Sequence, residues 1–242
     1  SGPVRGVDCS TQPVPFIQTR SRNLTGRPAE PQDRLQAQWP HLACRPLVVL
    51  VIASGNAHKV AEIAGMLSDL PLEVQQQPQG LEIEETGSTY LANARLKAEA
   101  VAQLTGQWAL ADDSGLEVDA LGGAPGIYSA RYASSDPERI ARLLQELGDT
   151  PYRSASFNSA MALAGPDGIT VLEAQGICRG EILHTPQGSG GGYDPIFWVR
   201  EAGCSYAELG PHLRLKLGSR GKAARQMAAE LRELLGLASA LG

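Results

Sequence analysis

The chain has few cysteines, and their spacing argues against two common ways of stabilising a fold. Four cysteines occur among 242 residues, none in a Cys-x-x-Cys pair and none with a histidine at zinc-finger spacing: Cys9, Cys44, Cys178 and Cys204. This pattern supports neither a disulfide framework nor a structural zinc site. We therefore expect reduced thiols that are buried or incidental.

The chain also lacks a long apolar run and an excess of basic residues. Its longest apolar run, Leu47 to Ala53, is far too short to cross a bilayer, and no charged-then-apolar signal peptide precedes it. The net charge of -5 argues against a protein that binds duplex nucleic acid, which normally carries a basic face. We expect a soluble, cytoplasmic protein without membrane or nucleic-acid partners; a small anionic substrate remains compatible.

Residues 1–45 differ in composition from the rest of the chain. They carry six arginines against three acidic residues, are rich in Pro, Gln, Ser and Thr, and have no sustained periodicity. Such a segment cannot bury enough apolar surface to become ordered. Because the chain also begins without Met, we predict a disordered or non-native extension over 1–45 and a single functional domain over 46–242.

From residue 46 onward, segments typical of strands alternate with segments typical of helices. The apolar run at 47–53 predicts a strand that is buried on both faces. The remaining predicted elements are helices at 57–70, 89–105, 136–147 and 220–235, a strand at 108–111, and a hairpin pairing 154–164 with 169–178. Helices and strands in this order indicate an α/β fold, and the hairpin argues against an all-parallel sheet.

The stretch Ala111-Asp112-Asp113-Ser114-Gly115 follows the apolar run 108–111 and places two adjacent carboxylates at a predicted strand end. Unpaired carboxylates are costly to desolvate, and a divalent cation is the simplest partner for them. A polar turn would explain the same residues. Because consecutive residues of an extended chain face opposite ways, we expect only one of the two, Asp113, to enter the site.

Two further motifs can bind an anion. Ser54 to Lys59 lies between the buried strand and the first helix, where α/β proteins bind anions through backbone N–H groups and the positive helix end. Asn93 and Lys97 project from one face of the second helix. An ordinary capped helix start and a solvated helix face explain these residues equally well when each is taken alone.

Two glycine-containing segments have the character of ligand-binding loops. Gly188 to Gly192 is a run of five small residues, which suits a loop whose backbone approaches a ligand closely, although a plain linker has the same composition. Arg220 and Lys222 begin the final helix, where the helix dipole disfavours cations. Their position is a sign of an anionic ligand.

Together these motifs resemble the inosine triphosphate pyrophosphatase family over about residues 47 to 235. The motifs are Ser54-Gly55-Asn56 with Lys59, Glu84-Glu85-Thr86-Gly87 leading to Asn93-Ala94 and Lys97, Ala111 to Leu116, Leu121 to Arg131, Gly192 to Phe197, and Ser219 to Lys222. The resemblance implies Mg²⁺-dependent hydrolysis of deaminated purine nucleoside triphosphates to the monophosphate and pyrophosphate. It also implies an elongated mixed β-sheet with flanking helices, two lobes around a central cleft, and a homodimer.

The resemblance also implies a role for individual residues. The phosphate chain would be bound by Ser54, Gly55, Asn56, Ala57, His58, Lys59 and Lys97. Mg²⁺ would be held by Glu85 and Asp113, with Glu84 as an alternative or additional ligand, and Asp113 would also be the general base. The base site would consist of Ser114, Gly192, Tyr193, Asp194, Arg214, Ser219 and Arg220.

The chain departs from the family pattern in the base site. Gly191 stands where the family has a stacking Phe, Ser219 stands where it has His, and Arg214 where it has Lys. Tyr193 can supply a stacking ring in place of the missing Phe if the loop turns it toward the ligand, and we expect base discrimination to be looser. Two alternatives are a nucleotide-binding protein with weak or lost turnover and a pyrophosphatase for pyrimidine or methylated nucleotides.

Overall fold

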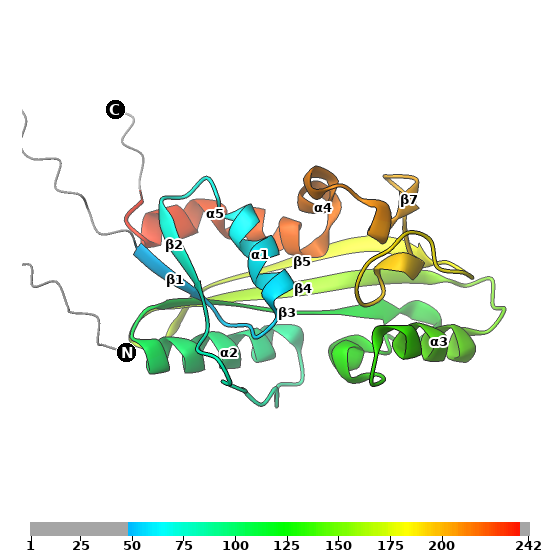
Figure 1. Cartoon of the computed structure of the whole chain (residues 1–242), viewed down its shortest axis with the longest axis horizontal. Helices are drawn as coiled ribbons and strands as arrows, with labels where there is room; N and C mark the ends of the chain where they lie inside the picture. The colour runs from blue at the N-terminus through cyan, green and yellow to red at the C-terminus, as the bar shows by residue number, and fades with distance from the viewer. Residues whose placement is uncertain (1–47, 238–242) are drawn as a thin grey trace, which may run out of the picture. The chain divides into compact units, whose positions relative to one another are not determined.

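The computed structural model describes residues 48–237 (Figure 1). The predicted extension at 1–45 lies outside the described residues. The described residues form one compact unit.

The unit is built on one seven-stranded sheet with the strand order β2-β1-β3-β4-β5-β6-β7. The strands are β1 (Val48–Ile52), β2 (Leu72–Gln76), β3 (Trp108–Val118), β4 (Ser154–Ala164), β5 (Thr170–Ile182), β6 (Phe197–Val199) and β7 (Cys204–Ser205). β1 pairs in parallel with β2 and β3, and every later pairing is antiparallel. The predicted mixed α/β sheet is therefore confirmed.

Helices cover both faces of this sheet. They are α1 (Ala57–Met66), α2 (Tyr90–Thr105), α3 (Asp136–Leu147), α4 (Pro211–Leu217) and α5 (Ser219–Leu234), and a 3₁₀ segment, η3 (Gly126–Arg131), follows β3. In Figure 1, α2 and α3 lie on one face, whereas α1, α4 and α5 lie on the other. Local chemistry explains the starts of two helices, because the side chains of Asn56 and Thr89 accept hydrogen bonds from the first turns of α1 and α2.

Several predicted boundaries were wrong. The first helix ends at Met66, although Leu67 and Leu70 still pack into the core beyond it. The last helix begins at Ser219 and ends at Leu234, one residue earlier at each end than the predicted range 220–235. The short elements β2, β6, β7 and α4 were not predicted, because segments of two to seven residues carry little periodic signal.

The acidic pair lies inside a strand, contrary to the prediction. Asp112 and Asp113 do not end a strand: β3 continues through them to Val118, and they pair with Met161 and Ala160 of β4. Strand interiors are normally poor places for Asp. Here both residues are buried, so their charges must be compensated by other parts of the fold.

The two faces of β3 belong to different apolar clusters. On the α2 face, Ala109 and Ala111 pack in an alanine-rich cluster with Ala98 of α2. On the α5 face, Leu110 packs with Met227 of α5 in a second cluster. A third cluster covers the farther part of the sheet and contains Leu116, Leu143, Ile182, Phe197 and Tyr206. Alternation along β3 therefore directs Asp112 to the α5 face and Asp113 to the α2 face.

Candidate active site

Asp112 is a buried anion bound by cations from two helices. Its Oδ2 lies 2.9 Å from Lys59 Nζ at the start of α1 and 3.2 Å from Arg220 Nη2 at the start of α5. Ser114 Oγ donates a third hydrogen bond to the same oxygen. Burial alone would raise the pKa of Asp112, but Arg220 and Lys59 outweigh it and hold the pKa well below its usual range. Asp112 is thus ionised and ties both helix starts to β3.

Asp113, on the opposite face of the strand, is bound by α2. Asn93 Nδ2 donates to Oδ2 at 3.1 Å, and Lys97 Nζ lies 3.3 Å from Oδ1. Burial raises the pKa of Asp113 above its ordinary value, although Lys97 opposes that shift. A carboxylate with a raised pKa accepts a proton more readily, which suits a general base. The predicted helix face of Asn93 and Lys97 therefore contacts the carboxylate directly.

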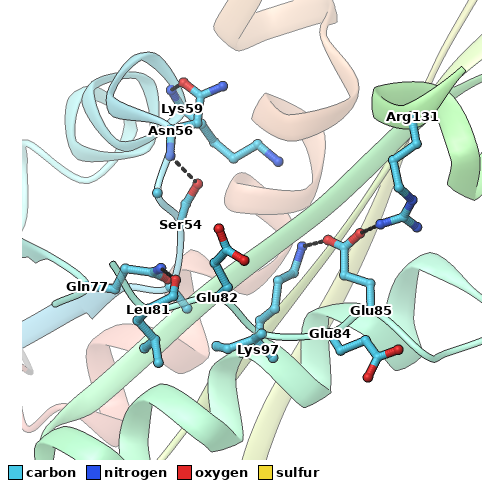
Figure 2. A pocket seen from close by; sticks show the side chains of 13 residues that line it. Ser54, Asn56, Lys59, Gln77, Leu81, Glu82, Glu84, Glu85, Lys97 and Arg131 are labelled. Atoms are coloured by element: carbon cyan, nitrogen blue, oxygen red, sulfur yellow. Dashed lines mark hydrogen bonds and ion pairs between the residues drawn. The ribbon is translucent and has the colours of Figure 1, made fainter. Parts of the chain in front are cut away.

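Glu85 lies in the irregular segment between β2 and α2 and forms two ion pairs (Figure 2). Lys97 Nζ is 2.8 Å from Oε1, and Arg131 Nη1 is 2.8 Å from Oε2. Burial opposes the charge of Glu85, but these two cations prevail and lower its pKa. Lys97 therefore lies between two carboxylates, Glu85 and Asp113, that come from different elements. Its own pKa is raised, because Asp113 and Glu85 outweigh its burial.

The start of α1 is arranged as predicted for a capped helix. The Asn56 side chain accepts from the backbone N–H groups of His58 at 2.9 Å and Lys59 at 3.2 Å, and Ser54 Oγ accepts from Asn56 N. Gly55, Asn56, Ala57 and His58 are exposed. The His58 and Lys59 N–H groups thus already donate to Asn56, and an anion arriving here would find the positive end of the helix and the ammonium of Lys59.

A cavity of about 760 Å³ lies among these groups (Figure 2). Predicted residues that line it are Ser54, Gly55, Asn56, Lys59, Glu84, Glu85 and Lys97, whereas Ala57 and His58 do not. Lining residues that received no predicted role are Ala53, Gln77, Leu81, Glu82, Ile83 and Arg131. The sequence indicated two of these residues, because Arg131 is the last residue of the motif Leu121 to Arg131 and Glu82 lies two residues before Glu84-Glu85. Nothing in the sequence indicated Gln77 or Leu81.

Glu84 and Glu85 occupy different positions although they are adjacent. Glu84 is exposed, and Figure 2 shows its carboxylate pointing away from Lys97. Glu85 carries both ion pairs. Glu85 is accordingly the better placed of the two for binding a cation beside Asp113.

The predicted base-site residues gather elsewhere and do not line this cavity. Asp194 Oδ2 lies 2.9 Å from Arg214 Nη1, and burial raises the Asp194 pKa against the effect of Arg214. Arg220 also pairs with Glu62. Gly192 N donates to Asp136 Oδ2 at 2.6 Å. The hydroxyls of Ser219 and Ser159 are 2.8 Å apart in a buried pair, so the hydroxyl of Ser219 is already engaged within the protein.

The expectation that Tyr193 supplies a stacking ring was wrong. Tyr193 is only 5% exposed and belongs to the third apolar cluster. Its hydroxyl donates to the Ser129 carbonyl at 3.1 Å. The loop turns this ring into the core because the buried ring gains apolar contacts and its hydroxyl finds a partner there. The ring of Tyr193 therefore stabilises the fold and is not exposed for stacking on a base.

The oxygen ligands of the site suit a hard divalent cation. Among residues 48–237, no three His, Cys, Asp or Glu side chains converge on a metal position. Glu85 and Asp113 nevertheless direct carboxylate oxygens at one ammonium group, that of Lys97. Mg²⁺ is usually held by one or two carboxylates together with substrate phosphates and water. This pair fits such an ion, with the substrate completing its coordination.

Similar proteins have the same fold and share much of the sequence. A dITP/XTP pyrophosphatase of Synechococcus sp. (strain CC9311) is 54% identical over 188 residues, which are 77% of this chain and 91% of that protein. A protein of the same name from Nostoc sp. is 54% identical over 176 residues, 72% of this chain and 90% of its own length. The solved structure of a HAM1 protein from Coxiella burnetii is 41% identical with a TM-score of 0.70, covering 77% of this chain and all of that one.

In the described part of the chain, no helix is long and apolar enough to span a membrane.

The Ham1 family model matches residues 50–230, which include every element that borders the cavity. Together with the relatives above, this match confirms the resemblance inferred from the motifs. The chain therefore belongs to the Ham1 family.

Proposed function

We propose that this protein is a Mg²⁺-dependent pyrophosphatase that hydrolyses inosine, deoxyinosine and xanthosine triphosphates to the monophosphate and pyrophosphate. The names of its relatives support this activity. The observation that carries the proposal is that Lys97 joins two carboxylates, Glu85 and Asp113. Lys97, Glu85 and Lys59 line the cavity, and Asp113 contacts Lys97 without lining the cavity itself. A protein that only bound nucleotides would need the cations but would have no use for this carboxylate pair.

The phosphate chain would be bound by cations and backbone donors from different elements. Lys59 of α1 and residues 54–56 before this helix lie on one side of the cavity, and Lys97 of α2 lies on another. Both ammonium groups also donate to the Asp112 carbonyl oxygen, at 3.4 Å and 3.0 Å, so this oxygen holds the two cations near each other. Two cations fixed before binding reduce the entropy lost when a triphosphate becomes ordered.

Asp113 is the proposed base. It would take a proton from a water molecule whose oxygen attacks the α-phosphorus, while the bond from that phosphorus to the α–β bridging oxygen breaks and pyrophosphate leaves. Asn93 holds Oδ2 of Asp113, and the Ser114 N–H donates to Oδ1 at 3.1 Å, so the carboxylate is already oriented. Glu85 and Asp113 would hold Mg²⁺, which when bound neutralises phosphate charge and favours departure of pyrophosphate.

Selection of the base would depend on the second group of residues, which includes Ser114, Asp194, Arg214 and Arg220. A 6-keto purine needs a hydrogen-bond donor at that position, and the guanidinium groups can supply one. The amino group of adenine would bring a donor of its own, so a buried donor would be left without a partner and affinity would fall. Gly192 and Ser219 adjoin this group through their own hydrogen bonds.

We also propose a cytoplasmic location, because nucleoside triphosphates are intracellular metabolites, and a homodimer, because the family resemblance implies one. Light scattering coupled to gel filtration distinguishes a dimer from the 25.6 kDa monomer.

A panel of triphosphates tests the activity. Purified protein with Mg²⁺ should release pyrophosphate from inosine and xanthosine triphosphates and far less from adenosine, guanosine and pyrimidine triphosphates. A chelator should stop this release, and added Mg²⁺ should restore it. Orthophosphate instead of pyrophosphate would mean that a different bond is cut, and no product from inosine triphosphate would refute the proposal. A preference for pyrimidine or methylated nucleotides would favour the alternative substrate class.

Asp113→Asn tests the assignment of the base. The amide keeps the shape of the side chain but cannot take up the proton, so turnover should fall about 100-fold to 10,000-fold. Asp119→Asn, at an exposed position just after the same strand, is the matched control and should leave turnover unchanged. Thermal unfolding of both variants checks the fold. Full turnover in Asp113→Asn would exclude Asp113 as the base.

A further inference from the structure

Arg131 lines the cavity but received no role from the motifs. Its side chain is 50% exposed, and Nη1 donates to Glu85 Oε2. Figure 2 places it on the far side of Glu85 from Ser54, Asn56 and Lys59. Within residues 48–237, its Nε and Nη2 donate to no protein acceptor, so they remain available to an oxyanion in the cavity.

The backbone that carries Arg131 is fixed against β3. Ser129 Oγ accepts from the Leu116 N–H at 2.9 Å and donates to the Gly126 carbonyl at 2.6 Å. The Ser129 carbonyl in turn accepts from Tyr193. These bonds join η3 to the strand that carries Asp113 and to the third apolar cluster. Arg131 therefore extends from an anchored base, and only its side chain needs to move.

The ion pair with Glu85 explains how Arg131 can move from a carboxylate to a phosphate. In the nucleotide-free protein, Glu85 carries two cations, Lys97 and Arg131, on its two oxygens. A divalent cation on Glu85 would repel the neighbouring guanidinium, which would then be attracted to the other anion in the cavity, the phosphate chain. A guanidinium binds phosphate through two parallel N–H donors, so Arg suits this task better than a point charge does.

We propose that Arg131 is a phosphate-binding residue that rests on Glu85 in the empty site and binds the triphosphate chain opposite Lys59. The triphosphate would then be held by three cationic side chains, contributed by α1, α2 and η3. This inference rests on the proposed function for the identity of the triphosphate. Arg131 itself recognises phosphate oxygens and not the base.

Binding without turnover tests the inference. Affinities for an inosine triphosphate analogue with an imido group in place of the α–β bridging oxygen, which the proposed reaction cannot cleave, and for inorganic tripolyphosphate, which has no base, are measured by calorimetry with Mg²⁺ present. We expect Arg131→Gln to weaken both ligands about tenfold or more and Arg131→Lys to recover part of the loss, since it keeps the charge but not the bidentate geometry. The control is Arg95→Gln, because Arg95 is 49% exposed and also pairs with a glutamate, Glu173, but lines no part of this cavity.

Three outcomes would overturn the inference. Arg131→Gln could bind tripolyphosphate within twofold of the wild type, it could lose affinity for the inosine triphosphate analogue alone, or it could lose no more than Arg95→Gln. Thermal unfolding of each variant excludes a general loss of structure as the cause. Pyrophosphate release by the wild type is measured separately, so failure of the proposed activity would leave the phosphate assignment standing and the reverse is also true.

Discussion

Lys97 Nζ lies 3.3 Å from Asp113 Oδ1 and fills the space between that carboxylate and Glu85. This lysine is an internal counter-ion: it prevents the buried carboxylate of Asp113 and the half-buried carboxylate of Glu85 from facing each other uncompensated. A divalent cation bound by the same pair must share or displace the ammonium. Release of Lys97 toward the phosphate chain would couple metal binding to nucleotide binding.

Removal of Lys97 should therefore strengthen binding of the metal and weaken binding of the nucleotide. For Lys97→Met, we expect the Mg²⁺ affinity of nucleotide-free protein to rise about tenfold and the affinity for inosine triphosphate to fall. Calorimetry at pH 8, where the carboxylates are ionised, measures both. Lys59→Met is the control for the Mg²⁺ affinity alone, because Lys59 pairs with Asp112 and not with Glu85 or Asp113. Equal Mg²⁺ affinities in the wild type and Lys97→Met would rule out competition for one position.

Asp112 should matter for stability as well as for the site. Asp112→Asn leaves Lys59 and Arg220 without their buried partner, and breaking such a pair costs about 3–5 kcal/mol. Urea unfolding at pH 7 measures this loss. Asp119→Asn, which changes an exposed carboxylate, should alter the free energy of unfolding by less than about 0.5 kcal/mol. A similar small change in Asp112→Asn would show that the network does not stabilise the fold.

The same network predicts a dependence on pH. Because the folded-state pKa of Asp112 lies below the unfolded value of about 3.9, its contribution is complete above that value and is lost as pH falls toward the folded pKa. The wild type should thus lose stability more steeply than Asp112→Asn below about pH 4. Urea midpoints measured from pH 5 downward compare the two slopes. Parallel slopes would contradict the depressed pKa.

Gly115 allows η3 to approach β3. A Cβ here would collide with the Gly126 carbonyl oxygen and lie 2.7 Å from Ser129 Oγ. Gly115→Ala should cost about 1–3 kcal/mol and, by displacing η3, weaken triphosphate binding in the same way as Arg131→Gln. Gly65→Ala in exposed α1, where a Cβ meets nothing within 4 Å, should stabilise the protein by about 0.5–1 kcal/mol. Urea unfolding measures the changes in stability, and calorimetry measures triphosphate binding. Unchanged triphosphate binding in Gly115→Ala would show that the position of Arg131 does not depend on the packing of η3 against Gly115.

Tyr193 should contribute to folding and not to base stacking. Tyr193→Leu removes the buried ring and should lower stability, yet the ratio of affinities for inosine triphosphate and tripolyphosphate should stay within about twofold of the wild type. A stacking ring would contribute about 1–3 kcal/mol to that ratio. Tyr193→Phe keeps the ring and loses only the bond to Ser129, so it is the matched control. A tenfold fall of the ratio in Tyr193→Leu alone would restore the stacking role.

Local chemistry made much of this protein predictable. The caps Asn56 and Thr89 start helices because their side chains satisfy backbone donors within three residues. Asn93 and Lys97 share a helix face because four residues make about one turn. Asp112 and Asp113 face opposite sides of the sheet because extended chain alternates, as their separate partners confirm. Each of these inferences needs only neighbours in the sequence.

Other features depended on residues far apart in the chain. Two adjacent aspartates favour a strand end when only local propensity is considered, yet β3 continues because Lys59, Lys97 and Arg220 arrive from three helices. The orientation of the Tyr193 ring depended on a carbonyl 64 residues away. The sequence by itself determined the long helices, the central strand, the hairpin, the motifs and the family. Tertiary structure decided which carboxylate faces which cation, because Coulomb interactions and burial depend on distances that only packing brings into being.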